Sequence, residues 1–156
     1  MTHREHDEHV VMESSVITDF LTVGTNLCCE GHEKKLRDIG AELDISLEYE
    51  DTPIPKMFST FLWLPVVDHH APTMEQLDVG TAAIGEAEAN GYRAYVHCRN
   101  GHGRGPTLAV AYFIRKGMSP AEAEEFVRSK RPEINPTDAQ RNCLAEWEKR
   151  VRQNRG

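Results

Sequence analysis

The sequence predicts an α/β fold: a single domain with a central, mainly parallel sheet flanked by helices. Short segments rich in β-branched and aromatic residues alternate along the chain with longer segments that carry helix start and stop signals, and this alternation is typical of a parallel sheet covered by helices. The chain has 156 residues, a length that favours one domain with a core of its own. No repeat or low-complexity linker divides it.

The first half of the chain predicts strands joined by one short helix. Residues 14–25 are rich in β-branched and aromatic side chains and predict one or two short strands. We expect a short helix over 33–38, ended by a glycine. Apolar and polar residues alternate over 41–49, which predicts a half-buried strand, and 60–67 predicts another strand. Two prolines in 51–57 mark the loop between them.

The second half is mostly helical. Thr73 and Gln76 have the spacing of a capping box, and Ser119 before Pro120 is a second helix start. Residues 93–97 predict a strand buried on both faces. Helices are expected over 73–90, over 105–117, over 119–132 and from residue 137 or 138 onwards.

Composition and charge exclude several classes of partner. The formal net charge of -7 argues against nucleic acid or an anionic membrane, because both are bound chiefly by a positive surface. No apolar run approaches the length of a membrane span, and the first residues lack the apolar stretch of a secretory signal, so we expect a cytoplasmic protein. Four cysteines fit no metal spacing and are expected to be reduced thiols: Cys28, Cys29, Cys98 and Cys143.

The N-terminus predicts a flexible tail over residues 1–13, followed by the folded domain over 14–156. Three histidines in the tail, His3, His6 and His9, could suggest a metal site. Nothing downstream supplies matching ligands at a useful spacing, so a solvated tail is the better interpretation and we expect no metal.

Residues 97–105, with the sequence HCRNGHGRG, put a cysteine at the head of a glycine-rich run. The run joins the strand 93–97 to the next helix, so it lies at the carboxyl edge of the sheet, where open α/β sheets bind ligands. Backbone N–H groups that curl inward beside a helix N-terminus form an anion site that suits phosphate. The expected phosphate-binding residues are Arg99, Asn100, Gly101, His102, Gly103 and Arg104.

Three side chains of this loop have separate expected roles. Arg104 carries a planar fork that can hold two phosphate oxygens. Cys98 lies in the positive field of the amides and the arginine, which favours a nucleophilic thiolate. Strand alternation turns His97 away from Cys98, so we expect it to support the loop rather than act as a base.

Attack on phosphorus requires a proton donor for the leaving oxygen, and we assign that role to Asp68. It follows the strand 60–67 and therefore emerges at the same edge of the sheet as Cys98. Asp78 is a weaker candidate because it falls inside a predicted helix. His69 and His70 could contact substrate, although solvated loop histidines are the simpler interpretation.

These residues resemble the signature of the cysteine-based protein tyrosine phosphatases, and specifically the small dual-specificity branch. The resemblance rests on His97-Cys98-x5-Arg104 with Asp68 about thirty residues upstream. It implies a metal-free, cofactor-free phosphatase domain that hydrolyses phosphomonoesters through a phosphocysteine intermediate, with Asp68 first as acid and then as base. Phosphorylated proteins would be its substrates, and we expect a monomer.

Two departures from the family pattern leave alternatives open. Gly105 stands where the family usually has serine or threonine, so a catalytically weak protein that only binds phosphoproteins is one alternative, unless Thr107 or water replaces the hydroxyl. Arg99 and His102 occupy positions where lipid-hydrolysing relatives carry lysines, so a phosphoinositide phosphatase is another. An inert turn with a buried cysteine would not explain Arg104 and Gly103. A sulfur transferase also uses a cysteine loop, but Arg104 and Asp68 fit phosphate better.

Overall fold

The structure is a computed structural model, and it describes residues 13–26, 30–51 and 53–155. Its five strands form one sheet in the order β1-β2-β5-β3-β4. Neighbouring strands are parallel except for β1, which pairs antiparallel with β2, so the mainly parallel sheet is confirmed. The strands are β1 (Ser14–Thr18), β2 (Leu21–Gly24), β3 (Ala41–Glu48), β4 (Thr60–Val66) and β5 (Arg93–His97).

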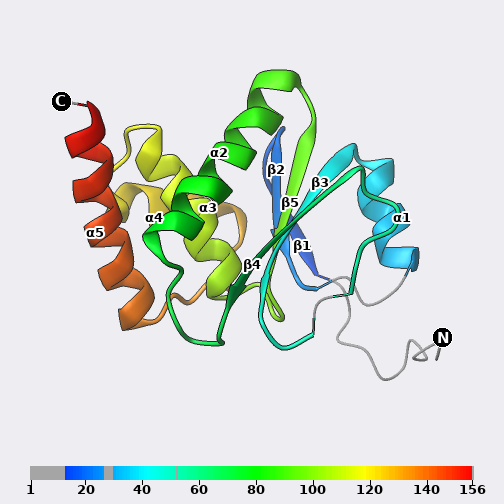
Figure 1. Cartoon of the computed structure of the whole chain (residues 1–156), viewed down its shortest axis with the longest axis horizontal. Coiled ribbons are helices and arrows are strands. Elements are labelled where there is room, and N and C mark those ends of the chain that lie inside the picture. The colour runs from blue at the N-terminus through cyan, green and yellow to red at the C-terminus, as the bar shows by residue number, and fades with distance from the viewer. Residues whose placement is uncertain (1–12, 27–29, 52, 156) are drawn as a thin grey trace.

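Helices cover both faces of the sheet, as the sequence predicts (Figure 1). One face carries α1 alone, and the other carries the remaining four helices. Within the described ranges, no helix is both long and apolar enough to span a bilayer. The helices are α1 (Glu30–Asp38), α2 (Met74–Asn90), α3 (Arg104–Arg115), α4 (Pro120–Lys130) and α5 (Asp138–Arg155).

Local signals position most helix ends. Thr73 and Gln76 form the predicted capping box, and the Ser119 side chain caps α4 by accepting from the N–H of Glu122. Gly91 ends α2 with a φ of 74°, a left-handed conformation that favours glycine. The predicted start of α1 is wrong by three residues, because the helix includes a glycine in its first turn, where glycine costs less than in a helix interior.

Two strands differ in how well their burial was predicted. β5 is buried along almost its whole length, as expected. The prediction of a half-buried β3 is wrong: its polar residues Asp44, Ser46 and Glu48 are as buried as its apolar ones. The physical reason is position, since β3 lies inside the sheet between β5 and β4.

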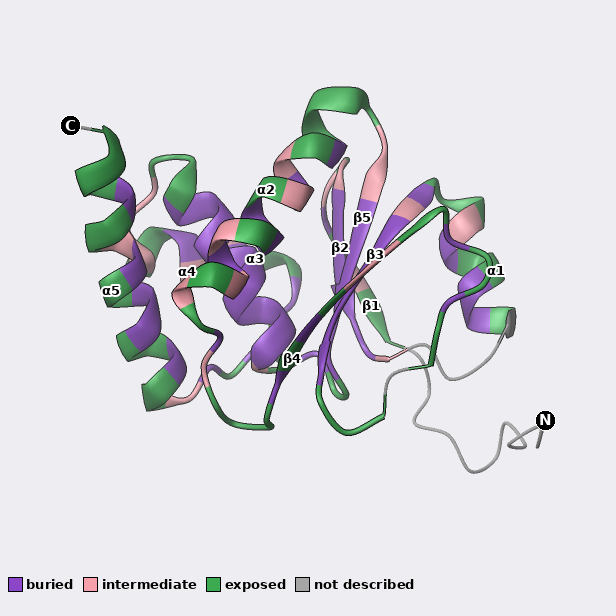
Figure 2. Cartoon of the chain, viewed as in Figure 1, coloured by how far each residue is buried: buried purple, intermediate pink, exposed green. Residues whose placement is uncertain are grey.

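The core centres on α3, which is buried on nearly all sides (Figure 2). It packs between the sheet and the helices α2, α4 and α5. Because α3 follows β5 directly, its N-terminus meets the carboxyl edge of the sheet. The fold therefore fixes both ends of the loop 98–103.

Some sequence predictions lie outside the described residues. These are the tail up to residue 12 with its histidines, and the cysteines Cys28 and Cys29. Glu13, the last residue of the expected tail, donates its N–H to the Thr25 hydroxyl at 3.2 Å. The other two cysteines, Cys98 and Cys143, are buried free thiols.

Candidate active site

A pocket of about 220 Å³ lies over Cys98 at the carboxyl edge of the sheet. Cys98 is only 3% exposed. The pocket brings together the loop after β5, the turn after β4 and the first residues around α5. Its lining residues are Asp68, His69, Cys98, Asn100, His102, Gly103, Arg104, Asn135, Thr137 and Gln140.

The backbone of the loop turns its carbonyls outward over residues 99–102. The first of these carbonyls accepts from the N–H of Asn26 at 3.3 Å, and the last accepts from the N–H of Asn135 at 2.7 Å. Arg131 donates to the two between them, at 3.3 and 2.8 Å. Because a peptide unit is planar and trans, the following N–H groups face the other way, into the loop. This is the concave array of donors that binds anions.

Gly101 allows the loop to curl. Its φ is 70°, and a Cβ there would lie 2.6 Å from Nη2 of Arg131 and 2.8 Å from the carbonyl oxygen of Gly24. A side chain would therefore meet both left-handed strain and the backbone of β2.

Arg131 is a site residue that the sequence analysis missed. Its side chain is 0% exposed, and besides the loop carbonyls it binds the Ser15 hydroxyl at 3.0 Å and the Glu133 carboxylate at 3.2 Å. Nothing in its local pattern separates it from Arg128, the other arginine of the predicted helix. Its role depends on α4 ending beside the loop.

Arg104 is anchored by Glu50, a second residue that the sequence analysis missed. Both terminal nitrogens of the guanidinium bind the Glu50 carboxylate, and Nη1 also donates to the Val66 carbonyl at 2.7 Å. Burial disfavours the charged guanidinium, but the ion pair with Glu50 outweighs this cost, so the pKa of Arg104 is raised. The hydrogen bonds from Arg104 lower the pKa of Glu50.

One donor of Arg104 remains available. Its Nε is buried and has no hydrogen-bond partner among the described residues. Buried donors are nearly always paired, so an unpaired one at a pocket wall indicates a ligand position. Arg104 thus combines a fixed edge, held by Glu50, with a free donor suited to an anion.

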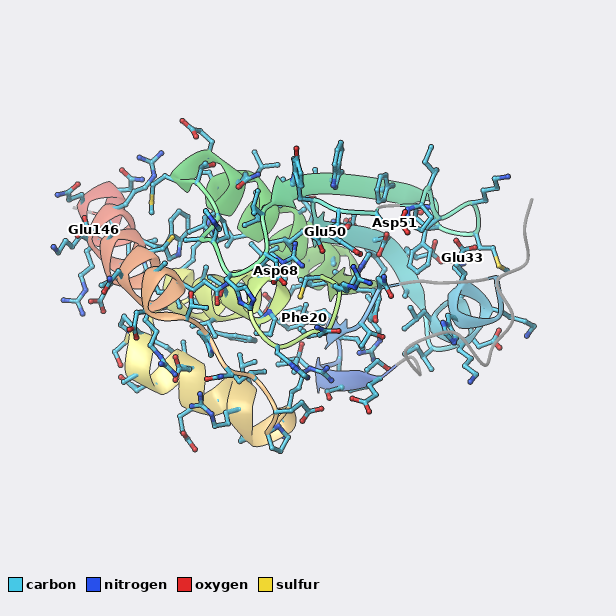
Figure 3. All side chains as sticks on the ribbon, turned by 90° about the horizontal axis from the view of Figure 1, so that it is seen from below. Phe20, Glu33, Glu50, Asp51, Asp68 and Glu146 are labelled. Atoms are coloured by element: carbon cyan, nitrogen blue, oxygen red, sulfur yellow. The ribbon has the colours of Figure 1, made fainter. Side chains whose placement is uncertain are left out.

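Asp68 lies at the rim of the same pocket, as predicted. Its Oδ1 is 3.5 Å from Nη2 of Arg104 and accepts from the N–H of His69 at 3.0 Å. Its side chain is 51% exposed, so it is accessible to solvent and to a substrate. Figure 3 views this edge of the sheet and shows Glu50 and Asp68 near its centre.

The alternative acid, Asp78, is held elsewhere. It lies on α2 and pairs with Arg150 of α5 at 2.6 Å. It does not line the pocket over Cys98.

His97 lies behind the loop in a buried polar cluster. Its Nε2 is 2.8 Å from Oδ1 of Asp44, and its ring stacks on Tyr95 with centroids 5.3 Å apart. Burial raises the pKa of Tyr95, whose hydroxyl donates to the Thr25 carbonyl. Asp44 is one of three carboxylates in the segment 41–49, so nothing in the sequence singled it out.

The Thr107 hydroxyl is committed within α3. It donates to the Gly103 carbonyl at 2.7 Å, one helical turn back. It therefore does not take the place of a hydroxyl at position 105. A Cβ at Gly105 would find its nearest neighbours, in the backbone of His97 and Cys98, at 3.4 Å or more, which is ordinary contact.

Within the described part of the chain, no three histidine, cysteine or carboxylate side chains gather to hold a metal ion. The chemistry of this pocket is instead that of anion binding beside a thiol. A central strand, a cysteine, an inward-facing amide loop and an arginine on the next helix define the class of cysteine-based phosphatases.

The chain belongs to the dual specificity phosphatase family: the family model of its catalytic domain matches residues 23–150. It is 35% identical over 78 residues to phosphatidylglycerophosphate phosphatase PTPMT1 of Arabidopsis thaliana, covering 49% of this chain and 23% of that protein. It is also 35% identical over 100 residues to human dual specificity protein phosphatase 16, covering 63% of this chain and 15% of the relative. The match thus spans less than a quarter of the length of either relative.

Solved structures share the fold. The crystal structure of PTPMT1 in complex with PI(5)P matches with a TM-score of 0.83 at 24% identity. The match covers 90% of this chain and 97% of that one. The fold likeness therefore extends over almost the whole domain.

Proposed function

We propose that this protein hydrolyses phosphomonoesters as a protein tyrosine or dual-specificity phosphatase, with Cys98 as its nucleophile. The observation that carries the proposal is the loop over Cys98, where four successive carbonyls turn outward and the buried Nε of Arg104 is left without a partner. Inward amides and a guanidinium together match the oxygens of a phosphate group.

In the first step, the Cys98 thiolate attacks phosphorus and a sulfur–phosphorus bond forms. The bond from phosphorus to the leaving oxygen breaks, and its electron pair goes to that oxygen. The carboxylic acid of Asp68 donates its proton to the same oxygen, so the alcohol or phenol leaves neutral. The loop amides and Arg104 stabilise the charge on the transferring group.

In the second step, water attacks phosphorus and gives its proton to the Asp68 carboxylate. The sulfur–phosphorus bond breaks and its electron pair returns to Cys98 as thiolate. Inorganic phosphate leaves. Gly105 provides no hydroxyl for the departing sulfur, and Thr107 donates within its own helix, so this step is expected to be the slower one.

The substrates that we propose are phosphorylated proteins. The pocket is lined mainly by polar side chains and backbone, and a net charge of -7 disfavours nucleic acid and anionic membranes. We propose a cytoplasmic monomer in which residues 14–156 form the catalytic domain and residues 1–13 a tail. No metal or cofactor takes part in the proposed steps.

A phospholipid phosphate is the second candidate substrate. Two observations favour it: the relative from Arabidopsis is named a phosphatidylglycerophosphate phosphatase, and a neighbouring structure contains PI(5)P. Arg99 and His102 are exposed beside the loop and could contact a lipid headgroup. A phosphoprotein-binding protein with little turnover is the third alternative, and the glycine at position 105 is its only support.

Turnover of p-nitrophenyl phosphate separates the enzyme from the binding protein. We expect the wild type to turn over this substrate and Cys98→Ser to lose turnover. Cys143→Ser removes the other thiol of the described residues and should retain turnover. Phosphotyrosine, phosphoserine and phosphothreonine peptides and phosphoinositide vesicles then rank the substrates. If the protein released phosphate from the phosphoinositide vesicles and from none of the peptides, its substrate would be a lipid and not a phosphorylated protein.

A further inference from the structure

The turn that carries Asp68 holds an unfavourable backbone conformation. The N–H of His70 binds the Val67 carbonyl at 2.9 Å, closing a turn over 67–70. Within it, His69 has a φ of 66°, and it is the one non-glycine residue with a positive φ in the described chain. Such a conformation is unfavourable for a non-glycine residue and persists when the surroundings hold it. The turn is also exposed, so its own packing does not hold it.

Two side chains at the start of α5 hold the turn. The Thr137 hydroxyl donates to the His69 carbonyl at 3.1 Å. Nε2 of Gln140 donates to the His70 carbonyl at 3.0 Å. Both bonds reach across about seventy residues of sequence and end on consecutive carbonyls of the strained turn.

The same two side chains form a capping box on α5. The Thr137 hydroxyl accepts from the N–H of Gln140 at 3.2 Å, and Oε1 of Gln140 accepts from the N–H of Thr137 at 2.9 Å. Each side chain therefore makes one hydrogen bond to the backbone at the start of α5 and another to the turn. Helix α5 is anchored in the core by Trp147, which is 2% exposed.

Gln140 also contacts the cysteine loop. It is 1% exposed, and a Cβ on Gly103 would lie 3.1 Å from its Oε1. The first turn of α5 therefore lies against the turn of Asp68 and against the loop of Cys98 at once. It sets the distance between the two parts of the pocket.

We propose that Thr137 and Gln140 are positioning residues for Asp68. They hold the turn 67–70 so that the Asp68 carboxyl faces the leaving oxygen of a phosphate bound over Cys98. This inference rests on the proposed function, in which Asp68 is the proton donor. Outside its own helix, the Thr137 side chain bonds only a backbone carbonyl of the turn, so its effect is on proton donation rather than on phosphate binding. Gln140 also lies against the cysteine loop, so Thr137 is the residue that tests the positioning role.

The test compares substrates that need a proton donor with substrates that do not. Phenyl phosphate has a poor leaving group and requires the acid, whereas 2,4-dinitrophenyl phosphate leaves without protonation. We expect Thr137→Val to lower kcat/KM for phenyl phosphate about tenfold, a part of the roughly hundredfold or larger contribution of a general acid. For the dinitrophenyl ester we expect a change of less than about twofold.

Three controls separate positioning from loss of the helix cap. Thr137→Ser keeps the hydroxyl and should restore turnover of phenyl phosphate. Ser119→Ala removes the side-chain cap of α4, which touches no part of the turn, and should cost similar stability without changing the ratio of the two substrates. Faster amide hydrogen exchange at residues 69–71 in Thr137→Val, and not in Ser119→Ala, would support release of the turn.

The decisive arm repeats Thr137→Val in an Asp68→Asn background. If Thr137 acts through Asp68, Thr137→Val causes no further loss of kcat/KM for phenyl phosphate in that background. In Asp68→Asn, the fall of kcat/KM at high pH that deprotonation of the acid would cause is already absent. Additive losses, or equal losses for both leaving groups, would overturn the positioning role. If Asp68→Asn itself leaves phenyl phosphate turnover unchanged while Cys98→Ser abolishes it, the acid assignment and this inference both fail, and the nucleophile stands.

Discussion

Gly105 stands where the family resemblance leads us to expect a serine or threonine. A Cβ there would meet the backbone of His97 and Cys98 at 3.4 Å or more, so the backbone does not exclude a side chain. The Thr107 hydroxyl, which could have replaced it, is bound within α3. The departure is therefore chemical rather than steric, and it bears on how readily sulfur leaves phosphorus.

We expect Gly105→Ser to accelerate breakdown of the phosphocysteine. A hydrogen bond to a charged group contributes about 1.5–3 kcal/mol, which corresponds to roughly tenfold or more in rate. Stopped-flow measurement with p-nitrophenyl phosphate should give a burst in the wild type that shrinks in the variant as kcat rises. Gly85→Ser is the matched control, because Gly85 is a half-buried glycine of α2 with no atom closer than 3.9 Å to its Cβ. An unchanged rate of phosphocysteine breakdown in Gly105→Ser would contradict a role for the missing hydroxyl.

At the scale of elements, Arg131 links the end of α4 to the cysteine loop. It holds two of the four outward carbonyls, and lysine lacks the fork to bind both. We expect Arg131→Lys to weaken inhibition by inorganic phosphate about tenfold and to cost about 2 kcal/mol of stability, because at least one of the two loop carbonyls loses its donor.

Arg128→Lys is the control for that change. Arg128 lies on the same helix, is 31% exposed and pairs with Glu124 at 2.9 Å, so the substitution should cost under about 1 kcal/mol. If phosphate inhibited Arg131→Lys and Arg128→Lys equally weakly, Arg131 would not act through the loop.

The elements were largely predictable because their signals are local. Thr73 with Gln76, Ser119 with Pro120 and the glycine after α2 mark helix ends within a few residues of sequence. Cys98 and Arg104 were predictable for the same reason, since one short loop carries both.

The rest of the site depends on contacts between distant segments. Glu50 meets Arg104 across 54 residues of sequence, and Thr137 meets His69 across 68. Such pairs follow from strand order and helix placement, which a single sequence does not specify. The burial of Asp44 was mispredicted on the same ground, because alternation does not tell an interior strand from an edge strand.

At the scale of the whole molecule, Glu48 at the end of β3 and Glu50 just after it give stability opposite dependences on pH. Burial is the largest cause that raises the pKa of Glu48 above 4.5, and hydrogen bonds from Arg104 lower that of Glu50 below 4.5. The folded state holds the Glu48 proton more tightly than the unfolded state, so this contribution to stability falls as pH rises through the folded pKa. The contribution of Glu50 is present above its unfolded pKa and is lost as pH falls through the folded one.

Glu48→Gln and Glu50→Gln should therefore change the unfolding free energy in opposite directions with pH. Between about pH 3 and about pH 7, the stability of Glu48→Gln relative to the wild type should rise, and that of Glu50→Gln should fall. Urea unfolding across this range measures both. Changes of the same sign would contradict the assigned burial of Glu48 or the ion pair of Glu50.

The proposed mechanism requires one chemical intermediate, a phosphoryl group on Cys98. The direct measurement is acid quenching of the full-length protein during turnover of p-nitrophenyl phosphate, followed by mass spectrometry of its peptides. We predict one added phosphoryl group on the peptide that contains Cys98, and none in Cys98→Ser, which should also lack turnover. Continued turnover in Cys98→Ser, or a phosphoryl group on any other residue, would contradict Cys98 as the nucleophile.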